Sequence, residues 1–251
     1  MAQDFNGSAL AMTSDGLSAA ATKLGVTPVE IWTVFEVETN GCGFLNTRSP
    51  IIRYEKAVFS RLTKRAFDDK IQISAGDTSY GALNAALAFD RKAALQSCSW
   101  GLGQVMGENF AMVGFTSVED MVTAMCGGED AQLMAMAAFA IANRLDSALR
   151  GHLWAVYAKG YNGPNFADNH YDTKLANAFA KYSTGPLPDL NIRAAQMYLG
   201  FHGFPGLMVD GVVGPHTIAA LTKFQEQNGL HVSGEPDEAT LSALAALPIT
   251  S

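Results

Sequence analysis

Two prolines within three residues interrupt the chain in the segment STGPLPDLN, residues 183–191. Proline lacks a backbone donor and clashes with the preceding helical turn, so no helix can run through this segment. Before it, apolar residues recur at spacings of three and four, and no long alternating β-branched run appears. We therefore predict a mostly α chain with a small sheet at most. Its domains would be residues 1–183 and 192–251, joined by a linker at 184–191.

The periodic pattern predicts helices in several segments of the first part. Residues 28–38 show the start signals most completely, because Thr27 can cap the helix and Pro28 suits its first turn. Glu30 completes a capping box with Thr27. The other expected helical segments are residues 80–89, 119–125, 131–149 and 171–182.

The second part contains an internal repeat. VDGVVGPHTIAAL, residues 209–221, aligns with HVSGEPDEATLSAL, residues 231–244. Each copy has a glycine for a tight loop, then a threonine, then an alanine- and leucine-rich helical face that can pack inward. With a helix at 191–203 and another ending at 228–229, the repeat predicts a bundle of three short helices. The matching positions are Gly211, Thr217 and Leu221, then Gly234, Thr240 and Leu244.

Helical phase separates the two glutamates in the stretch WTVFEVETNGCGF, residues 32–44. Ile31, Val34 and Phe35 form an apolar stripe, and Glu38 continues it at the last turn of the helix. Glu36 points about 200° away from Glu38, at about 100° per residue, so it should lie closer to solvent.

A carboxyl group in the position of Glu38 should have a raised pKa. Burial disfavours the charged form, and the negative end of a helix acts in the same direction. A general acid needs such a raised pKa to hold its proton near neutral pH. The alternative is that Glu38 pairs with a buried arginine, such as Arg48 or Arg53, and only stabilises the fold.

Three segments together resemble the motifs of the lysozyme-like superfamily, which includes goose-type lysozymes and soluble lytic transglycosylases. They are VETNG (37–41), SCSWGLGQVMG (97–107) and KGYNGP (159–164). Over residues 18–183 the chain resembles more closely the N-acetylmuramidases of phage and prophage endolysins. One departure lies at residues 54–57, where Tyr-Glu-Lys-Ala replaces a Phe-Glu-Arg-His-type run and keeps only Glu55.

The resemblance implies a lysozyme-like catalytic domain that hydrolyses the β-1,4 bond between N-acetylmuramic acid and N-acetylglucosamine. Glu38 would be the general acid. Glu55 is the favoured second carboxylate, although it can equally be a structural ion-pair partner. Other candidates are Glu36, Asp68 and Asp77, and the substrate's own acetamido group can also assist.

The same resemblance implies which residues line the cleft. Amide and hydroxyl groups suit sugar hydroxyl and N-acetyl groups, and Gly101 and Gly103 would let the backbone approach the glycan. For Ser99 and Tyr161 the alternative is a buried hydrogen-bond network. We expect Trp32, Trp100 and Trp154 to be core residues rather than sugar platforms. The expected cleft residues are Ser99, Gln104, Tyr161 and Asn162.

Residues 190–247 resemble the peptidoglycan-binding domain common in bacterial and phage wall hydrolases. Its signature is present as Asp210, Gly211, Gly214, Thr217, Phe224 and Gln225. We expect the repeated glycines and threonines to be structural. Wall contacts would come from Tyr198, Phe201, Asp210 and Gly211. Bacterial peptidoglycan is therefore the expected partner, and a variant truncated after Tyr182 is expected to cut but to bind the wall less tightly.

Composition excludes several other classes. The net charge is -7 and no basic cluster is visible, which argues against nucleic acid. No apolar run reaches transmembrane length, and the first residues do not form an ordinary secretory signal. We expect a monomer made in the host cytoplasm that reaches the periplasmic wall through a holin-type lesion. The three cysteines and five histidines show no clustered ligand pattern, so we expect free thiols, no metal and no cofactor.

Two other functions stay open on the sequence alone. A lytic transglycosylase shares the three motifs and would leave 1,6-anhydro-muropeptides. A non-catalytic wall-binding protein would carry Glu38 for structural reasons only.

Overall fold

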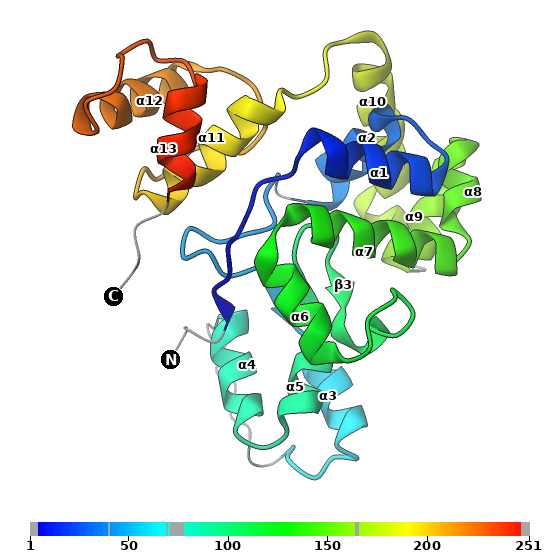
Figure 1. Ribbon diagram of the computed structural model, residues 1–251. Helices are drawn as coiled ribbons and strands as arrows, with labels where there is room; N and C mark the ends of the chain where they lie inside the picture. Colours follow the sequence, from blue (N-terminus) through cyan, green and yellow to red (C-terminus); the bar gives the residue numbers. More distant parts are fainter. Residues whose placement is uncertain (1–4, 40, 69, 71–77, 164–165, 247–251) are drawn as a thin grey trace.

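The computed structural model describes residues 5–39, 41–68, 70, 78–163 and 166–246, without the side chains of Glu38, Asn162 and Phe166. The chain is mostly helical with one small sheet, which confirms the predicted fold class (Figure 1). The helices of the first part are α1 (Ser14–Leu24), α2 (Pro28–Glu38), α3 (Lys56–Leu62), α4 (Ser79–Leu87), α5 (Arg91–Gln96), η2 (Gly107–Asn109), α6 (Val118–Gly127), α7 (Glu129–Ala142), α8 (Leu145–Arg150), α9 (Trp154–Asn162), η3 (Phe166–Asn169) and α10 (Tyr171–Thr184).

Helix α2 begins and ends where its sequence signals predict. The Thr27 backbone N–H donates to Glu30 Oε2 at 2.9 Å, and Thr27 Oγ1 accepts from the start of the helix, which completes the capping box. At the other end, Thr39 Oγ1 donates to the Phe35 carbonyl oxygen at 2.8 Å. The stripe at Ile31, Val34 and Phe35 is buried, as predicted. Helix α10 packs along α2.

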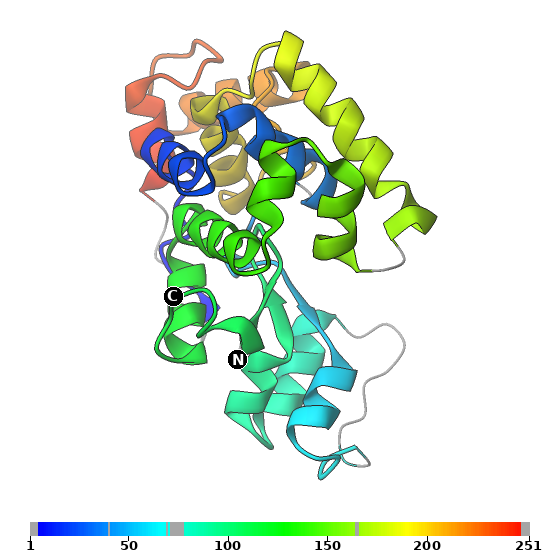
Figure 2. The same ribbon diagram turned by 90° about the vertical axis from the view of Figure 1, so that its right-hand side faces the viewer.

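The sheet is antiparallel, in the order β1 (Ile52–Tyr54), β2 (Cys98–Trp100) and β3 (Val105–Met106). Arg53 pairs with Ser99 in its register. The side chain of Trp100 is fully buried, and its indole N–H donates to the Leu95 carbonyl oxygen at 3.1 Å. Figure 2 shows this sheet with α3, α4 and α5 as a separate lobe below the helices α8 to α10.

The segment expected to be helical at 131–149 forms two helices, α7 and α8. Arg144 has a left-handed backbone, with φ of 59°, and precedes α8. Asn143 is the C-cap of α7, and its side-chain amide donates to the Phe139 carbonyl oxygen of that helix at 2.9 Å. A side-chain hydrogen bond of this kind competes with the backbone hydrogen bonds of a helix. The helix therefore ends here, although the apolar periodicity of the sequence continues into α8.

Up to residue 246, three helices form the second part: α11 (Leu190–Phe201), α12 (Pro215–Gln227) and α13 (Glu238–Ala245). The predicted three-helix bundle is therefore confirmed. Helix α12 ends at Gln227 with Asn228 as its C-cap, and Gly229 follows with φ of 66°, as the Asn-Gly pair indicates.

A glutamine on each of two helices, α11 and α12, holds the loop that follows. Gln196 Oε1 accepts from the backbone N–H groups of Asp210 and Gly211, at 3.0 and 2.9 Å. Its amide nitrogen lies 3.3 Å from Thr217 Oγ1, to which it donates. Gly211 has φ of 70°, and a Cβ there would lie 2.8 Å from the Asp189 carbonyl oxygen. The first loop therefore requires glycine.

The second copy repeats this arrangement. Gln225 Oε1 accepts from the N–H groups of Ser233 and Gly234, at 3.0 and 2.9 Å, and its amide donates to Thr240 Oγ1 at 3.0 Å. The repeated glycines and threonines thus have structural roles in both copies, as expected. Both copies also share a glutamine, Gln196 in the first and Gln225 in the second. The alignment of the two repeat segments did not include it.

The second hydrophobic core crosses the domain boundary. Besides residues of α11, α12 and α13, it contains Ala9, Ala11 and Phe44 from the first part of the chain. A buried ion pair between Arg193 of α11 and Glu129 of α7 lies at the same contact. The second domain is therefore packed onto the first, rather than held only through the connection at 185–189.

Candidate active site

The second predicted motif forms a tight turn that is tied to the chain after α2. The Ser99 hydroxyl donates to Gln104 Oε1 at 2.7 Å, and Gln104 Nε2 donates to the carbonyl oxygens of Gly101 and Ile51, at 2.8 and 3.1 Å. Ile51 in turn donates its N–H to the Gly43 carbonyl oxygen at 2.8 Å. The loop that follows Glu38 and the motif around Gln104 therefore belong to one hydrogen-bonded unit.

The third motif reaches the same turn from α9. The Tyr161 hydroxyl donates to the Gly103 carbonyl oxygen at 2.6 Å. Its ring stacks on Tyr157, with centroids 5.6 Å apart, and meets the edge of Phe139 at 5.9 Å. Ser99, Gln104 and Tyr161 thus come together. Ser99 is buried and bonded within the protein, which is the supporting role that the sequence left open for it.

The glycines of this turn are required by its packing, whether or not a glycan also approaches them. We expected Gly101 and Gly103 to let the backbone approach a glycan. A Cβ on Gly101 would lie 2.4 Å from the Gln132 side chain, and one on Gly103 would lie 2.6 Å from Met136. Both glycines therefore let the turn pack against α7, and Gly101 also adopts a positive φ of 66°.

Gln132 is a site residue that sequence reasoning missed. It is buried in α7, where Oε1 accepts from the Leu102 N–H at 2.7 Å and Nε2 donates to the Met125 carbonyl oxygen at 2.8 Å. It therefore anchors the turn between Ser99 and Gln104 from behind. The signal in the sequence is that Gln132 is a lone amide at the start of a long apolar run. A polar side chain that is buried on such a face needs hydrogen-bond partners.

Glu38 is the last residue of α2, and Asn162 is the last residue of α9. Their side chains lie outside the described part of the structure. The structure therefore places these two residues by their backbone alone, and their roles stay predictions. The two arginines offered as structural partners of Glu38 make other contacts. Arg48 donates to the Gly7 carbonyl oxygen at 2.8 Å, and Arg53 pairs with Glu55 at 2.9 Å.

Glu36 lies away from the buried stripe, as its helical phase predicts. Its carboxylate accepts hydrogen bonds from Lys181 Nζ, at 2.6 Å, and from the Tyr182 hydroxyl. Partial burial raises the pKa of Glu36, but the hydrogen bonds from Lys181 and Tyr182 and the charge of Lys181 outweigh it, so the net pKa is lowered. A carboxyl group with a lowered pKa is a poor proton donor near neutral pH.

The remaining carboxylate candidates differ in their surroundings. Glu55 precedes α3 and pairs with Arg53, whose side chain is 76% exposed, while that of Glu55 is 37% exposed. The ion pair with Arg53 fits the alternative that Glu55 only stabilises the fold, but the Glu55 carboxylate remains accessible to solvent. Asp68 accepts from the Ser60 hydroxyl at 2.9 Å. Asp77 lies outside the described residues.

Comparisons with known proteins agree with this geometry. Residues 27–183 match the family described as N-acetylmuramidase. The chain belongs to the N-acetylmuramidase family. It is a lysozyme-type glycoside hydrolase, and residues 189–244 match a putative peptidoglycan binding domain.

A solved structure, described as the crystal structure of Burkholderia AP3 phage endolysin, resembles this muramidase. The identity is 36% and the TM-score 0.63, over 68% of this chain and 70% of that one. A search of the curated proteins found no match.

The wall-binding prediction for the muramidase concerned four residues of the second domain. Tyr198 is buried, and its hydroxyl accepts from the Ala11 N–H at 3.0 Å, so it packs between the domains instead of on an exposed face. Phe201 is partly buried and meets the edge of Phe44, with centroids 6.5 Å apart. Asp210 Oδ1 accepts from Gln196 and from the Val212 N–H. Gly211 is needed by its loop.

The tryptophans of the muramidase lie mostly in its core, as expected. Trp32 and Trp100 are buried. Trp154 is partly exposed and stacks on His152, with centroids 5.3 Å apart, beside Phe179. All three cysteines are free; Cys98 and Cys126 are buried, and Cys42 is partly buried.

Within the described residues, no group of three or more His, Cys, Asp or Glu side chains is placed to hold a metal ion. No helix in that part of the muramidase combines the length and the apolar character that crossing a bilayer requires.

Proposed function

We propose that this muramidase is an endolysin that cleaves the β-1,4 bond between N-acetylmuramic acid and N-acetylglucosamine, with Glu38 as the general acid. The observation that carries the proposal is the hydrogen-bonded unit that joins the loop after Glu38 to Gln104 and Tyr161. The second and third motifs supply Gln104 and Tyr161, and the loop that follows the first motif supplies Gly43 and Ile51, in a chain that belongs to the N-acetylmuramidase family.

In this mechanism, Glu38 donates its proton to the departing glycosidic oxygen. Positive charge then develops on the sugar ring, and a carboxylate across the cleft stabilises it or activates a water molecule. Glu55 is our candidate because it is open to solvent at the edge of the sheet, whereas Glu36 is already bonded to Lys181 and Tyr182. If Glu55 is dispensable, assistance from the acetamido group of the substrate takes its place.

Ser99, Gln104 and Tyr161 would shape the cleft wall. Their described hydrogen bonds hold one another and the turn at 101–104, so substitution should disturb the wall as well as any direct contact with sugar. Asn162, one residue after Tyr161, would bind an N-acetyl group through its amide.

Three matched variants test the assignment: Glu38→Gln, Glu36→Gln and Glu55→Gln. We expect Glu38→Gln to abolish hydrolysis of purified peptidoglycan with an unchanged melting temperature. Glu36→Gln should keep most of the activity, and Glu55→Gln should fall between the two. Full activity in Glu38→Gln would remove Glu38 from its role.

Product analysis separates this proposal from its two rivals. Mass spectrometry of digested wall should show reducing muropeptides. Anhydro-muropeptides as the main products would identify a lytic transglycosylase, and no products at all from the wild type would identify a wall-binding protein without catalysis.

We also propose that the protein acts as a monomer, is made in the host cytoplasm and meets the wall only after a holin-type lesion opens the membrane. The endolysin description of its structural relative supports this route. Expression in a Gram-negative host should cause lysis only together with a pore-forming protein. Lysis by this chain alone would contradict the proposed dependence on release.

A further inference from the structure

A groove of about 990 Å³ lies between the two domains. On one side it is lined by Phe35 and Thr39, at the end of α2, and on the other by Met208 and Val213 of the second domain. Ile51, whose carbonyl oxygen accepts from Gln104, also lines it. The groove therefore begins beside the unit that we assign to catalysis and continues onto the second domain.

The two walls of this groove are held in a fixed relation. Gly41, in the loop after α2, comes so close to the second domain that a Cβ would lie 2.5 Å from the Val209 carbonyl oxygen. Arg193 of the second domain donates to the Gly41 carbonyl oxygen at 2.6 Å. Because these contacts and the shared core fix the interface, the groove is a feature of the folded protein, and the connection at 185–189 forms part of its lining.

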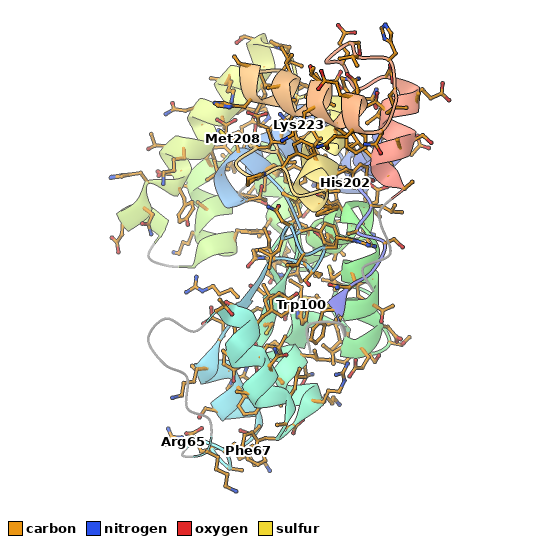
Figure 3. All side chains as sticks on the ribbon, turned by 90° about the vertical axis from the view of Figure 1, so that its left-hand side faces the viewer. Arg65, Phe67, Trp100, His202, Met208 and Lys223 are labelled. Carbon is orange, nitrogen blue, oxygen red and sulfur yellow. The ribbon has the colours of Figure 1, made fainter. Side chains whose placement is uncertain are left out.

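Exposed apolar side chains gather along this groove. Large hydrophobic side chains that remain exposed as a group mark sites of interaction, and domain interfaces are frequent ligand sites. Met208 is the most exposed, at 74%, and Figure 3 shows it where the second domain borders α2, drawn in blue. The other exposed apolar residues of the groove are Leu187, Val212 and Val213.

The charges of the groove already have partners. Lys181 is paired with Glu36. Asp189 Oδ1 accepts from the backbone at the start of α11, and Asp210 Oδ1 accepts from Gln196 and Val212. Among the described residues, the lining thus offers apolar surface and no unpaired cation, so it suits an uncharged ligand with methyl groups and C–H faces. An acidic peptide would meet the carboxylates of Asp189 and Asp210.

We propose that this groove binds the N-acetylated glycan strand of peptidoglycan as it leaves the cleavage site. The inference rests on the proposed function, because it takes the substrate from there. The second domain then contributes a wall of the extended substrate site, through Met208, Val212 and Val213. The neutral sugar chain, rather than the peptide stem, is the recognised part.

The test uses the Glu38→Gln variant of the full chain, labelled at its methionine methyl groups, and a hexamer of N-acetylglucosamine that carries no peptide. We expect titration with the hexamer to shift the methyl resonance of Met208. Adding Val213→Asp should weaken the affinity read from that resonance at least tenfold. The matched control is Val232→Asp, since Val232 is 47% exposed in the equivalent loop of the second repeat and does not line the groove. The affinity of the Val232→Asp control for the hexamer should stay within twofold of the affinity of the Glu38→Gln variant alone.

An unshifted Met208 resonance at saturating hexamer would overturn the proposal, as would equal losses in Val213→Asp and Val232→Asp. A stem peptide that shifts Met208 when the hexamer does not would also overturn it. Hydrolysis of peptidoglycan by the wild type is measured separately. If hydrolysis is present and the groove fails, only this inference falls; if hydrolysis is absent, the proposed function itself fails.

Discussion

Arg193 and Glu129 form a bidentate ion pair that is buried on both sides and joins the two domains. Glu129 also accepts from the N–H groups of Met12 and Gly43, each at 2.9 Å, so both carboxylate oxygens have two partners. Burial raises the pKa of Glu129, but the charge and hydrogen bonds of Arg193 outweigh it and the net pKa is lowered. The pair therefore holds the loop after α2 from the side of the second domain.

Removing the arginine should be costly. Arg193→Met leaves a buried, unpaired carboxylate, which typically costs about 3–5 kcal/mol in the free energy of unfolding. Urea denaturation of the purified variant measures this. The control is Arg91→Met, because Arg91 and Glu119 form a comparable pair whose side chains are 47% and 48% exposed. That change should cost less than about 1 kcal/mol. Equal effects would show that the buried pair has no special role.

Truncation after Tyr182 should do more than weaken wall binding. The sequence suggested that the first domain would still cut, but the truncated chain would lose Arg193 and expose Ala9, Ala11 and Phe44. We expect a lower melting temperature and a loss of hydrolysis even on soluble, uncross-linked glycan fragments. If the truncated chain hydrolyses these fragments at the wild-type rate, the two domains act as independent modules.

Stability should fall in acid through Glu129. Its folded pKa is below the ordinary value of 4.5, so its contribution is fully present above about pH 4.5 and is lost as the pH falls through the folded pKa. The difference in unfolding free energy between wild type and Glu129→Gln should therefore be constant from pH 5 to 7. Below pH 4.5 it should shrink. A difference that does not change down to pH 3 would contradict this assignment.

Cys42 offers a reporter of domain opening. Burial, followed by the charge of Glu129, raises the pKa of Cys42 to about 12. Since the thiolate is the reactive form, alkylation by iodoacetamide at pH 8 should be at least about a hundredfold slower in the native protein than in urea. Mass spectrometry of the digested protein reads the labelling. Arg193→Met should accelerate it under native conditions, and an unchanged slow rate there would show that the interface does not open.

Local signals of the sequence predicted local structure well. The capping box at Thr27 and Glu30 and the stripe at Ile31 and Val34 were readable because they depend on neighbours within one helix. The loop of the repeat was readable at Gly211 for the same reason, since a tight loop needs its unusual backbone angle. Of the candidate site, the meeting of Ser99, Gln104 and Tyr161 followed from family motifs.

Contacts between distant segments could not be read in this way. Glu129 and Arg193 are each an ordinary charged residue in the sequence, and only the folded chain buries them together. Tyr198 was taken for a surface aromatic because nothing local shows that the segment around Ala11 covers it. The glycines at 101 and 103 were assigned to a ligand, while the partner that requires them is α7, which lies much further along the chain.

The fixed contact between the domains also changes how binding and cutting combine. When two sites are joined by a flexible linker, the linker sets the effective concentration of the second binding event, and many geometries are tolerated. Here the ion pair of Arg193 and Glu129 replaces that freedom with one spacing. On the proposed function, a glycan strand whose shape fits this spacing engages both domains with little further loss of entropy, whereas a strand of another shape engages only one. The muramidase should therefore cut a wall first where its strands adopt that shape.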